Sequence, residues 1–171
     1  MIKIGAAREH DFSDPLGMLT DCHRRILRFL GVLQAVNAAV VPLGEAERTA
    51  LTLSLDYFQT GGMLHHADEE ESLFPRLPRT GVIESLQREH GEVAVLHQEV
   101  EHLGRTLAAT GILKPEEQAK FHLAVERLAS IYPQHILQEE AEVFATAEKL
   151  LTSEVKTVLG KEMAARRGLV R

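Results

Sequence analysis

Apolar residues recur at intervals of three and four along almost the whole chain, and alternating runs of β-branched residues are absent. This spacing places the apolar side chains on one face of a helix, so it predicts an all-α fold. Proline and glycine divide the chain, because proline ends helices and glycine favours turns. Four long helices are predicted over residues 14–40, 45–74, 82–109 and 115–150, followed by a short helix over residues 153–165.

The connections between these predicted helices are short, which favours antiparallel neighbours and an up-down-up-down four-helix bundle. Asp14 is expected to cap the first helix, with Pro15 at its first position. Gly61-Gly62 is expected to be a weak point within the second helix. Residues 1–171 are expected to form a single domain, with the bundle over about 14–151 and the short helix and a basic tail after it.

The composition excludes several classes of function. A net charge of −6 argues against a nucleic-acid groove or an anionic membrane surface. The single cysteine, Cys22, excludes a Cys-rich zinc site, and it is expected at the surface or at an interface. No secretory signal or membrane-spanning stretch is recognised, so a cytoplasmic protein is expected.

Histidine is unusually frequent, with nine residues against two tyrosines and no tryptophan. A weak repeat contains some of these histidines: "HHADEEESLF" (65–74) and "HILQEEAEVF" (135–144) both read His-x-x-x-Glu-Glu-x-x-aliphatic-Phe. A His-x-x-x-Glu pair shares one helix face, and metal sites in bundles are built from such pairs on facing helices. The same spacing also occurs by chance, as His97 and Glu101 show, so a pair alone is a weak signal.

The heights of the histidines within the predicted bundle give a stronger test. His23, His65 and His90 each lie about 9 residues, roughly 13 Å, from the same end of the bundle. His135 lies about 15 residues from the end of its helix, which is expected to overhang. Each helix therefore offers one histidine at a comparable height, and two of the helices add a carboxylate one turn away. The alternative is that these are ordinary core or surface histidines.

Four imidazoles and two carboxylates without thiolates suit iron or manganese, and also zinc. Six protein ligands are too many for one tetrahedral zinc ion but suit two metals bridged by the carboxylates. The predicted ligands are His23, His65, Glu69, His90, His135 and Glu139.

These motifs together resemble the hemerythrin-like (HHE cation-binding) family, from about Pro15 to Leu150. They are "CHRRI", "HHADEEESLFP", "REH" and "HILQEEAEVF". The resemblance implies a non-haem di-iron centre completed by an oxo or hydroxo bridge, at which manganese or zinc would also bind in vitro. It assigns His23 and His65 to one iron, His90 and His135 to the other, and Glu69 and Glu139 to both.

The chain departs from the family's oxygen carriers at two positions. Those proteins have His-x-x-x-His in helix three, but here Ala94 stands one turn after His90. They also have His-x-x-x-x-Asp in helix four, whereas Glu139 follows His135 at the shorter spacing. The first change opens one metal to water, to another residue or to a substrate. His66 is expected either to serve as a further ligand there or to lie in the outer shell or at the surface.

Tyr132 and His97 are candidates for the outer shell of the site. Tyr132 lies three residues before His135, so it would either reach the metals or pack in the core with its hydroxyl hydrogen-bonded. His97 lies about 10 Å along the helix axis from His90 and is a poor ligand for the same metal. The neighbouring acidic residues Asp68, Glu70, Glu71 and Glu140 are expected to be solvated.

Three hypotheses about function follow from this set. The first is a di-iron protein that binds dioxygen or reacts with small oxidants such as peroxide or nitric oxide, in sensing or detoxification. The second is an enzyme with peroxidase or catalase-like activity at the open iron. The alternative is an iron-dependent regulatory or metal-storage module without turnover. The expected partners are therefore dioxygen or another small oxidant, and neither nucleic acid nor a membrane.

Overall fold

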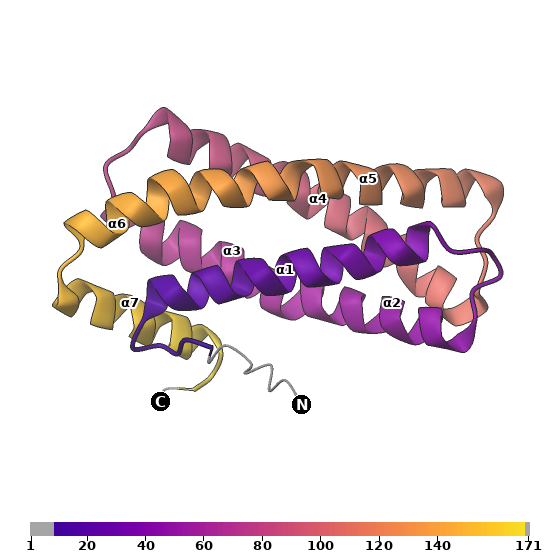
Figure 1. The fold of residues 1–171 in the computed structure, drawn as a ribbon, viewed down its shortest axis with the longest axis horizontal. Helices are drawn as coiled ribbons and strands as arrows, with labels where there is room; N and C mark the ends of the chain where they lie inside the picture. The colour runs from indigo at the N-terminus through magenta and orange to yellow at the C-terminus, as the bar shows by residue number, and fades with distance from the viewer. Residues whose placement is uncertain (1–8, 170–171) are drawn as a thin grey trace, which may run out of the picture.

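The computed structural model describes residues 9–169, and over this range it contains helices and no strand (Figure 1). Helix α1 forms the first of four rods, α2 and α3 the second, α4 the third, and α5 and α6 the fourth. Their bounds are Pro15–Asn37, Glu45–Tyr57, Met63–Asp68, Gly81–Thr110, Pro115–Gln138 and Ala145–Leu150. The predicted up-down-up-down bundle is confirmed.

The rods form a square in which α1 and α4 each pack against both α2 and α5. Helix α7 (Ser153–Arg166) packs against α1 and α3 at one end of the bundle, as Figure 1 shows. This helix is the predicted short fifth helix, and it ends one residue later than predicted. Within the described range, no helix is both long enough and apolar enough to cross a membrane.

The ends of the helices follow from local capping. Asp14 accepts a hydrogen bond from the Gly17 N–H at 3.1 Å, so the predicted cap of α1 is confirmed. At the end of α4, Gly111 has φ +79°, a left-handed conformation that glycine adopts without steric cost. Helix α1 ends at Asn37, three residues before the predicted end.

Three π-helical turns interrupt the second and fourth rods, at Phe58–Gly62, Glu69–Leu73 and Glu139–Phe144. The first contains the predicted weak point at Gly61-Gly62. The other two begin at the two predicted glutamate ligands. A π turn locally changes which side chains face inward, and such turns are frequent at functional sites. The spacing of apolar residues did not predict them.

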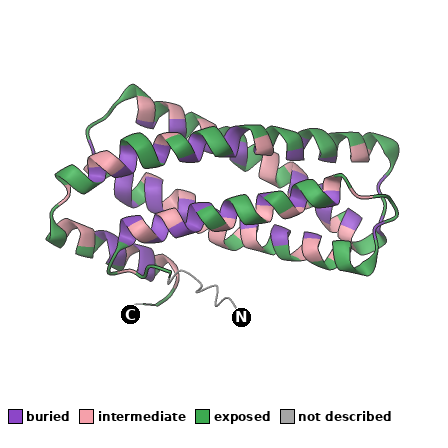
Figure 2. Ribbon diagram, in the orientation of Figure 1, coloured by how far each residue is buried: buried purple, intermediate pink, exposed green. Residues whose placement is uncertain are grey.

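A polar layer divides the apolar core into two clusters. One cluster fills the end of the bundle that carries α7, and the other fills the opposite end. Figure 2 shows buried residues on the inward faces of the rods on both sides of this layer. Apolar residues of opposite clusters flank the layer on three rods: Leu19 and Ile26 around His23, Leu86 and Val93 around His90, and Ile136 and Val143 around Glu139.

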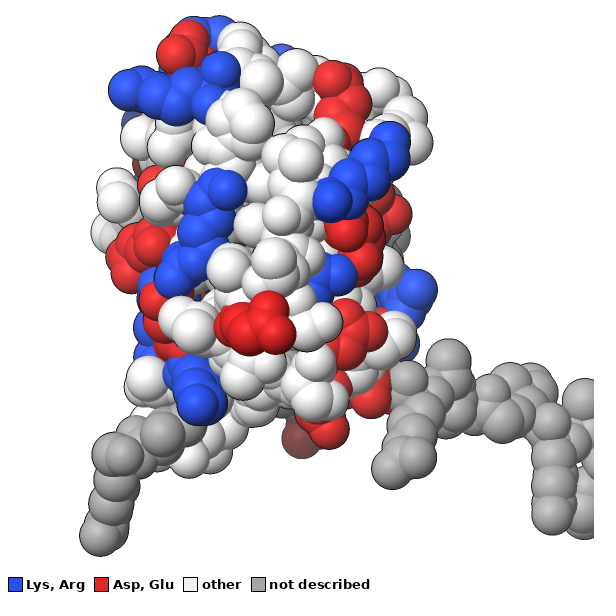
Figure 3. All heavy atoms as spheres, turned by 90° about the vertical axis from the view of Figure 1, so that its left-hand side faces the viewer, with Lys and Arg blue, Asp and Glu red and all other residues white. Residues whose placement is uncertain are grey.

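Buried ion pairs attach α7 to the bundle. Asp68 is fully buried, and its carboxylate accepts hydrogen bonds from Arg166 at 2.9 Å and Arg167 at 2.7 Å. The expectation that Asp68 is solvated was therefore wrong. A carboxylate without solvent requires paired charges, and the two guanidinium groups supply them. On the face shown in Figure 3, at the end with α6 and α7, acidic and basic side chains are interspersed.

We expect two glycine substitutions to affect stability in opposite directions. A Cβ at Gly160, in α7, would lie 1.9 Å from the carbonyl oxygen of Phe12, whereas a Cβ at Gly31, in α1, would meet nothing within 4 Å. Gly160→Ala should therefore destabilise the protein by about 1–3 kcal/mol through overpacking. Gly31→Ala should stabilise it by about 0.5–1 kcal/mol. Urea unfolding measures both, and equal stability of the two variants would contradict this packing of α7.

Candidate metal centre

The structure brings six of the predicted ligands together in the polar layer. All six are at most 4 % exposed. Their candidate ligand atoms form two groups, and within each group the atoms lie within 4.8 Å of one another. One group contains His23, His65, Glu69 and Glu139, and the other contains His90, His135 and Glu139. His23 lies with His65 and His90 with His135, the same pairs that the family resemblance implies.

Both carboxylates face both pairs of histidines. In Glu69, Oε1 lies 3.7 Å from Nε2 of His23, and Oε2 lies 3.5 Å from Nε2 of His90. Glu139 has the reverse arrangement, with Oε2 3.1 Å from Nε2 of His23 and Oε1 3.7 Å from Nε2 of His90. A carboxylate that presents one oxygen to each of two nitrogen pairs has the geometry of a bridging ligand between two cations.

Several inward-facing atoms of this layer lack hydrogen bonds. Both oxygens of Glu69, both oxygens of Glu139 and Nε2 of His23 are buried without a hydrogen-bond partner among the described residues. The Nε2 atoms of His90 and His135 face each other at 3.0 Å, so at most one proton can lie between them. Unpartnered buried polar atoms are rare and costly. Cations coordinated by these nitrogen and oxygen atoms would satisfy them, so the residues fit iron, manganese or zinc.

Burial and the mutual electrostatic interactions of the imidazoles and carboxylates set the ionisation of the layer. Burial lowers the pKa of His23, but the carboxylates of Glu139 and Glu69 outweigh this effect and raise that pKa to about 10. Burial and the charge of Glu139 raise the pKa of Glu69 to about 7. Burial acts to raise the pKa of Glu139, yet the close imidazoles of His135, His23 and His90 outweigh it and keep that pKa well below the ordinary value. Because only a neutral imidazole coordinates, metal binding would displace protons from the layer.

Three of the four histidines are oriented by an outer carboxylate. The Nδ1 atoms of His23, His90 and His135 lie 2.9, 2.8 and 2.8 Å from oxygens of Glu140, Glu70 and Glu89, respectively. Such a partner fixes the ring with Nε2 toward the centre and makes the imidazole a stronger ligand. Glu70 and Glu140 were expected to be solvated, and both are indeed partly exposed, but their contacts with ligand imidazoles were not predicted. Sequence reasoning did not identify Glu89.

The sequence repeat has a structural explanation in these contacts. In the first copy, Glu70 binds Nδ1 of His90, and Phe74 stacks on the same ring. The two ring centroids are 6.0 Å apart, and the ring planes are 6° from parallel. In the second copy the corresponding pair is Glu140 and Phe144, which contact His23, with ring centroids 5.3 Å apart at 7°. Each copy therefore supplies a histidine and a glutamate to the layer and also fixes a histidine of another rod.

The half of the layer around His90 and His135 has an outer hydrogen bond that the half around His23 and His65 lacks among the described residues. Glu89 holds Nδ1 of His135, but Nδ1 of His65 is buried without a hydrogen-bond partner among the described residues. Glu89 directly precedes a predicted ligand histidine on α4, and Cys22 has the same place on α1. Cys22 is buried, with its sulfur 3.2 Å from the guanidinium of Arg25. The expectation that Cys22 lies at the surface or at an interface was therefore wrong.

His66 lies beside the layer and belongs to neither group of candidate ligand atoms. Its ring stacks on His90, with centroids 4.2 Å apart and an angle of 21° between the planes. It also lines a pocket of about 150 Å³ together with Ala94, His97 and Tyr132. Nε2 of His97 and the hydroxyl of Tyr132 are hydrogen-bonded at 2.8 Å. The roles of His66, His97 and Tyr132 in metal binding stay predictions.

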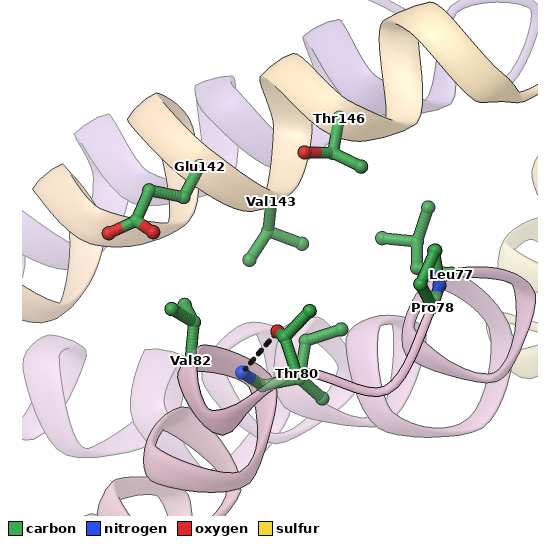
Figure 4. Close-up of a pocket in the computed structure, with 8 residues that line it drawn as sticks. Leu77, Pro78, Thr80, Val82, Glu142, Val143 and Thr146 are labelled. Carbon is green, nitrogen blue, oxygen red and sulfur yellow. Dashed lines mark hydrogen bonds between the residues drawn. The ribbon is translucent and has the colours of Figure 1, made fainter.

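A second pocket, of about 120 Å³, lies between the loop that precedes α4 and the end of the fourth rod (Figure 4). Val143 points into this pocket, while Glu142 lies at its edge. Thr80 accepts a hydrogen bond from the Ile83 N–H at 3.4 Å. None of the predicted ligands lines this pocket, so it is separate from the candidate metal centre.

Comparison with known proteins agrees with this geometry. A family profile described as Hemerythrin HHE cation binding domain matches residues 14–147, a range that includes the entire polar layer. The chain is also 31% identical over 163 residues to an uncharacterised protein of Haemophilus influenzae. That alignment covers 91% of each of the two chains.

We expect Glu69→Gln to remove most of the stabilisation by metal without weakening the metal-free protein. The substitution replaces one carboxylate oxygen that would bind a metal with an amide nitrogen, and it removes the repulsion between two buried acids. The native protein should gain about 2.7 kcal/mol at a hundredfold excess of Fe(II) over Kd, and the variant less than half of that. Anaerobic thermal unfolding with and without Fe(II) measures both quantities. Glu71→Gln, at an exposed position nearby, is the control, and an equal gain in Glu69→Gln would contradict the assignment.

Proposed function

The chain belongs to the hemerythrin HHE cation-binding family, and from this premise we propose that it is a non-haem di-iron protein that reacts with dioxygen or another small oxidant. The observation that supports this most is that each buried carboxylate faces both histidine pairs, while none of the four oxygens has a hydrogen bond among the described residues. His23 and His65 would hold one iron, His90 and His135 the other, and Glu69 and Glu139 would bind both. Two ferrous ions would supply the two electrons that reduce a peroxide bond.

The protein's own residues would orient the ligands and connect the layer to solvent. Glu70, Glu89 and Glu140 are each partly exposed and hydrogen-bonded to a ligand imidazole. They would hold the Nδ1 protons in place and provide a path for protons between the surface and the layer. The two apolar clusters on either side would exclude bulk water from the reacting atoms.

The open position would lie at the metal held by His90 and His135. With both carboxylates bridging, each metal would have two histidines and two carboxylates as protein ligands, so the two positions would differ in their surroundings. Ala94, one turn after His90, supplies no ligand atom and lines the adjacent pocket. An incompletely coordinated metal favours reaction with a small oxidant over simple retention of the metal.

The expected result of anaerobic reconstitution is about two Fe(II) ions per chain that are oxidised rapidly on addition of dioxygen or hydrogen peroxide. Stopped-flow absorbance measures the oxidation, and metal analysis measures the iron content. Glu69→Ala and His135→Ala should lose this reactivity because each removes a ligand, whereas Glu71→Ala should retain it. Slow oxidation at the rate of free Fe(II), or equal behaviour of all three variants, would refute the proposal.

A specific contact also supports a second candidate function, an iron-dependent regulatory or storage module. Asp68 directly precedes Glu69 in the chain, and both of its oxygens bind arginines of the α7 end. A change in charge or position at Glu69 would therefore act on the residue that attaches α7 to the bundle. Metal binding could in this way change the surface that the protein presents to a partner.

Under this second function, removal of the metal should loosen α7. Hydrogen exchange of the amides in α7 (Ser153–Arg166) should accelerate when a chelator removes the iron. Exchange in α2 (Glu45–Tyr57), which lies toward the opposite end of the bundle from α7 in Figure 1, should change much less. Hydrogen–deuterium exchange with mass spectrometry measures both helices in one experiment, and an unchanged α7 would exclude this mechanism.

A further inference from the structure

The pocket beside His66 opens to the surface and ends at a buried hydroxyl. Its rim includes Ala94 and Met63, both exposed, and Met63 is 61% exposed. Tyr132, which is only 1% exposed, lies at the inner end of the pocket. Phe58, from the first π-helical turn, supplies an aromatic wall. The pocket therefore combines the apolar side chains of Phe58, Met63 and Ala94 and the neutral amides of Gln59 and Gln98 with a buried hydroxyl at its inner end.

The polar end of the pocket carries no formal charge. No aspartate, glutamate, lysine or arginine lines the pocket. Burial lowers the pKa of His97 to about 4, so this imidazole is neutral near pH 7. The hydrogen bond between His97 and Tyr132 uses one of the bonding positions of the hydroxyl and leaves another for a ligand. Charged molecules would lose their hydration here without gaining an ion pair, so the chemistry favours a neutral ligand.

The volume indicates a ligand larger than the small oxidants. An engineered cavity of about 150 Å³ in another protein binds benzene, and the pocket beside His66 has about the same volume. Dioxygen, peroxide and nitric oxide each contain two heavy atoms and would leave most of this space unfilled. A six-membered ring with one hydroxyl group matches the volume and can hydrogen-bond to the buried hydroxyl at the inner end.

We propose that this pocket is a binding site for a neutral organic molecule of the phenol class. The ring would pack between Phe58 and Met63, and the hydroxyl would hydrogen-bond to the pair formed by Tyr132 and His97. His66 lines the pocket and stacks on His90, so the ligand would lie one side chain away from the polar layer. This site goes beyond the reaction with oxidants proposed above and does not depend on which metal the layer holds.

Titration of the full-length purified protein with phenol tests the proposal, using calorimetry and ligand-observed NMR. We expect saturable binding that Ala94→Leu abolishes, because a larger side chain at the exposed rim closes the pocket. The matched control is Val95→Leu, at a neighbouring position that is 65% exposed and outside the pocket. This control should bind phenol as tightly as the native protein.

A second variant tests the orientation of the ligand. Tyr132→Phe should weaken the binding of phenol by about fivefold, the effect of one hydrogen bond, and leave the binding of toluene unchanged. Circular dichroism checks that the variants are folded. The absence of saturable phenol binding to the native protein would overturn the proposal. Phenol binding that survives Ala94→Leu would overturn it too, because the ligand would then be bound elsewhere, for example on the metal.

Discussion

The close approach of two buried carboxylates, Glu69 and Glu139, is the constraint on which the rest of this structure depends. Two like charges in an apolar interior cost several kcal/mol unless positive charge compensates them. Four imidazoles surround the pair, and three of these imidazoles are in turn fixed by carboxylates at the edge of the layer. Even so, the four inward oxygens have no hydrogen-bond partner among the described residues, which is the arrangement expected of ligands to cations. The apolar clusters on both sides give the layer its low-dielectric surroundings and hold the rods in register.

The repeat and the π-helical turns show how two copies of one short motif supply most of the contacts of this layer. Each copy of the motif supplies a histidine and, one turn later, a glutamate at the start of a π turn. The residue after that glutamate and the phenylalanine that ends the motif then fix a histidine on a different rod. The two rods without the motif therefore need only one ligand histidine each, on a regular α-helix. The arrangement is not fully symmetric, because Cys22 stands where the other half of the layer has Glu89. The histidine without an outer carboxylate, His65, belongs to the half that contains His23.

The sequence predicted the fold and the layer because both depend on local properties. Helix rise and the positions of proline and glycine placed His23, His65 and His90 at one height, and His135 joined them only with the assumption that its helix overhangs. Contacts between rods were harder to predict, because a sequence pattern shows which face of a helix is apolar but not which residue of another helix lies opposite that face. Asp68, Glu70 and Glu140 looked like members of a solvated acidic run, yet arginines and imidazoles from elsewhere in the chain bind them. The role of Glu89 was not predicted, because nothing in the sequence except its place directly before His90 distinguishes it from other glutamates. Ala94 indicated an opening next to His90, but only the structure showed that His66 stacks on that ring beside a pocket.

A crystal structure of the iron-loaded protein, with anomalous diffraction recorded at the iron edge, tests the central claim most directly. We predict two anomalous peaks in the polar layer, about 3.5–4 Å apart, as in other two-metal sites. One peak should lie next to Nε2 of His23 and His65, and the other next to Nε2 of His90 and His135, with Glu69 and Glu139 between them. A single peak, or iron bound outside the layer, would contradict the assignment of a bridged two-metal centre.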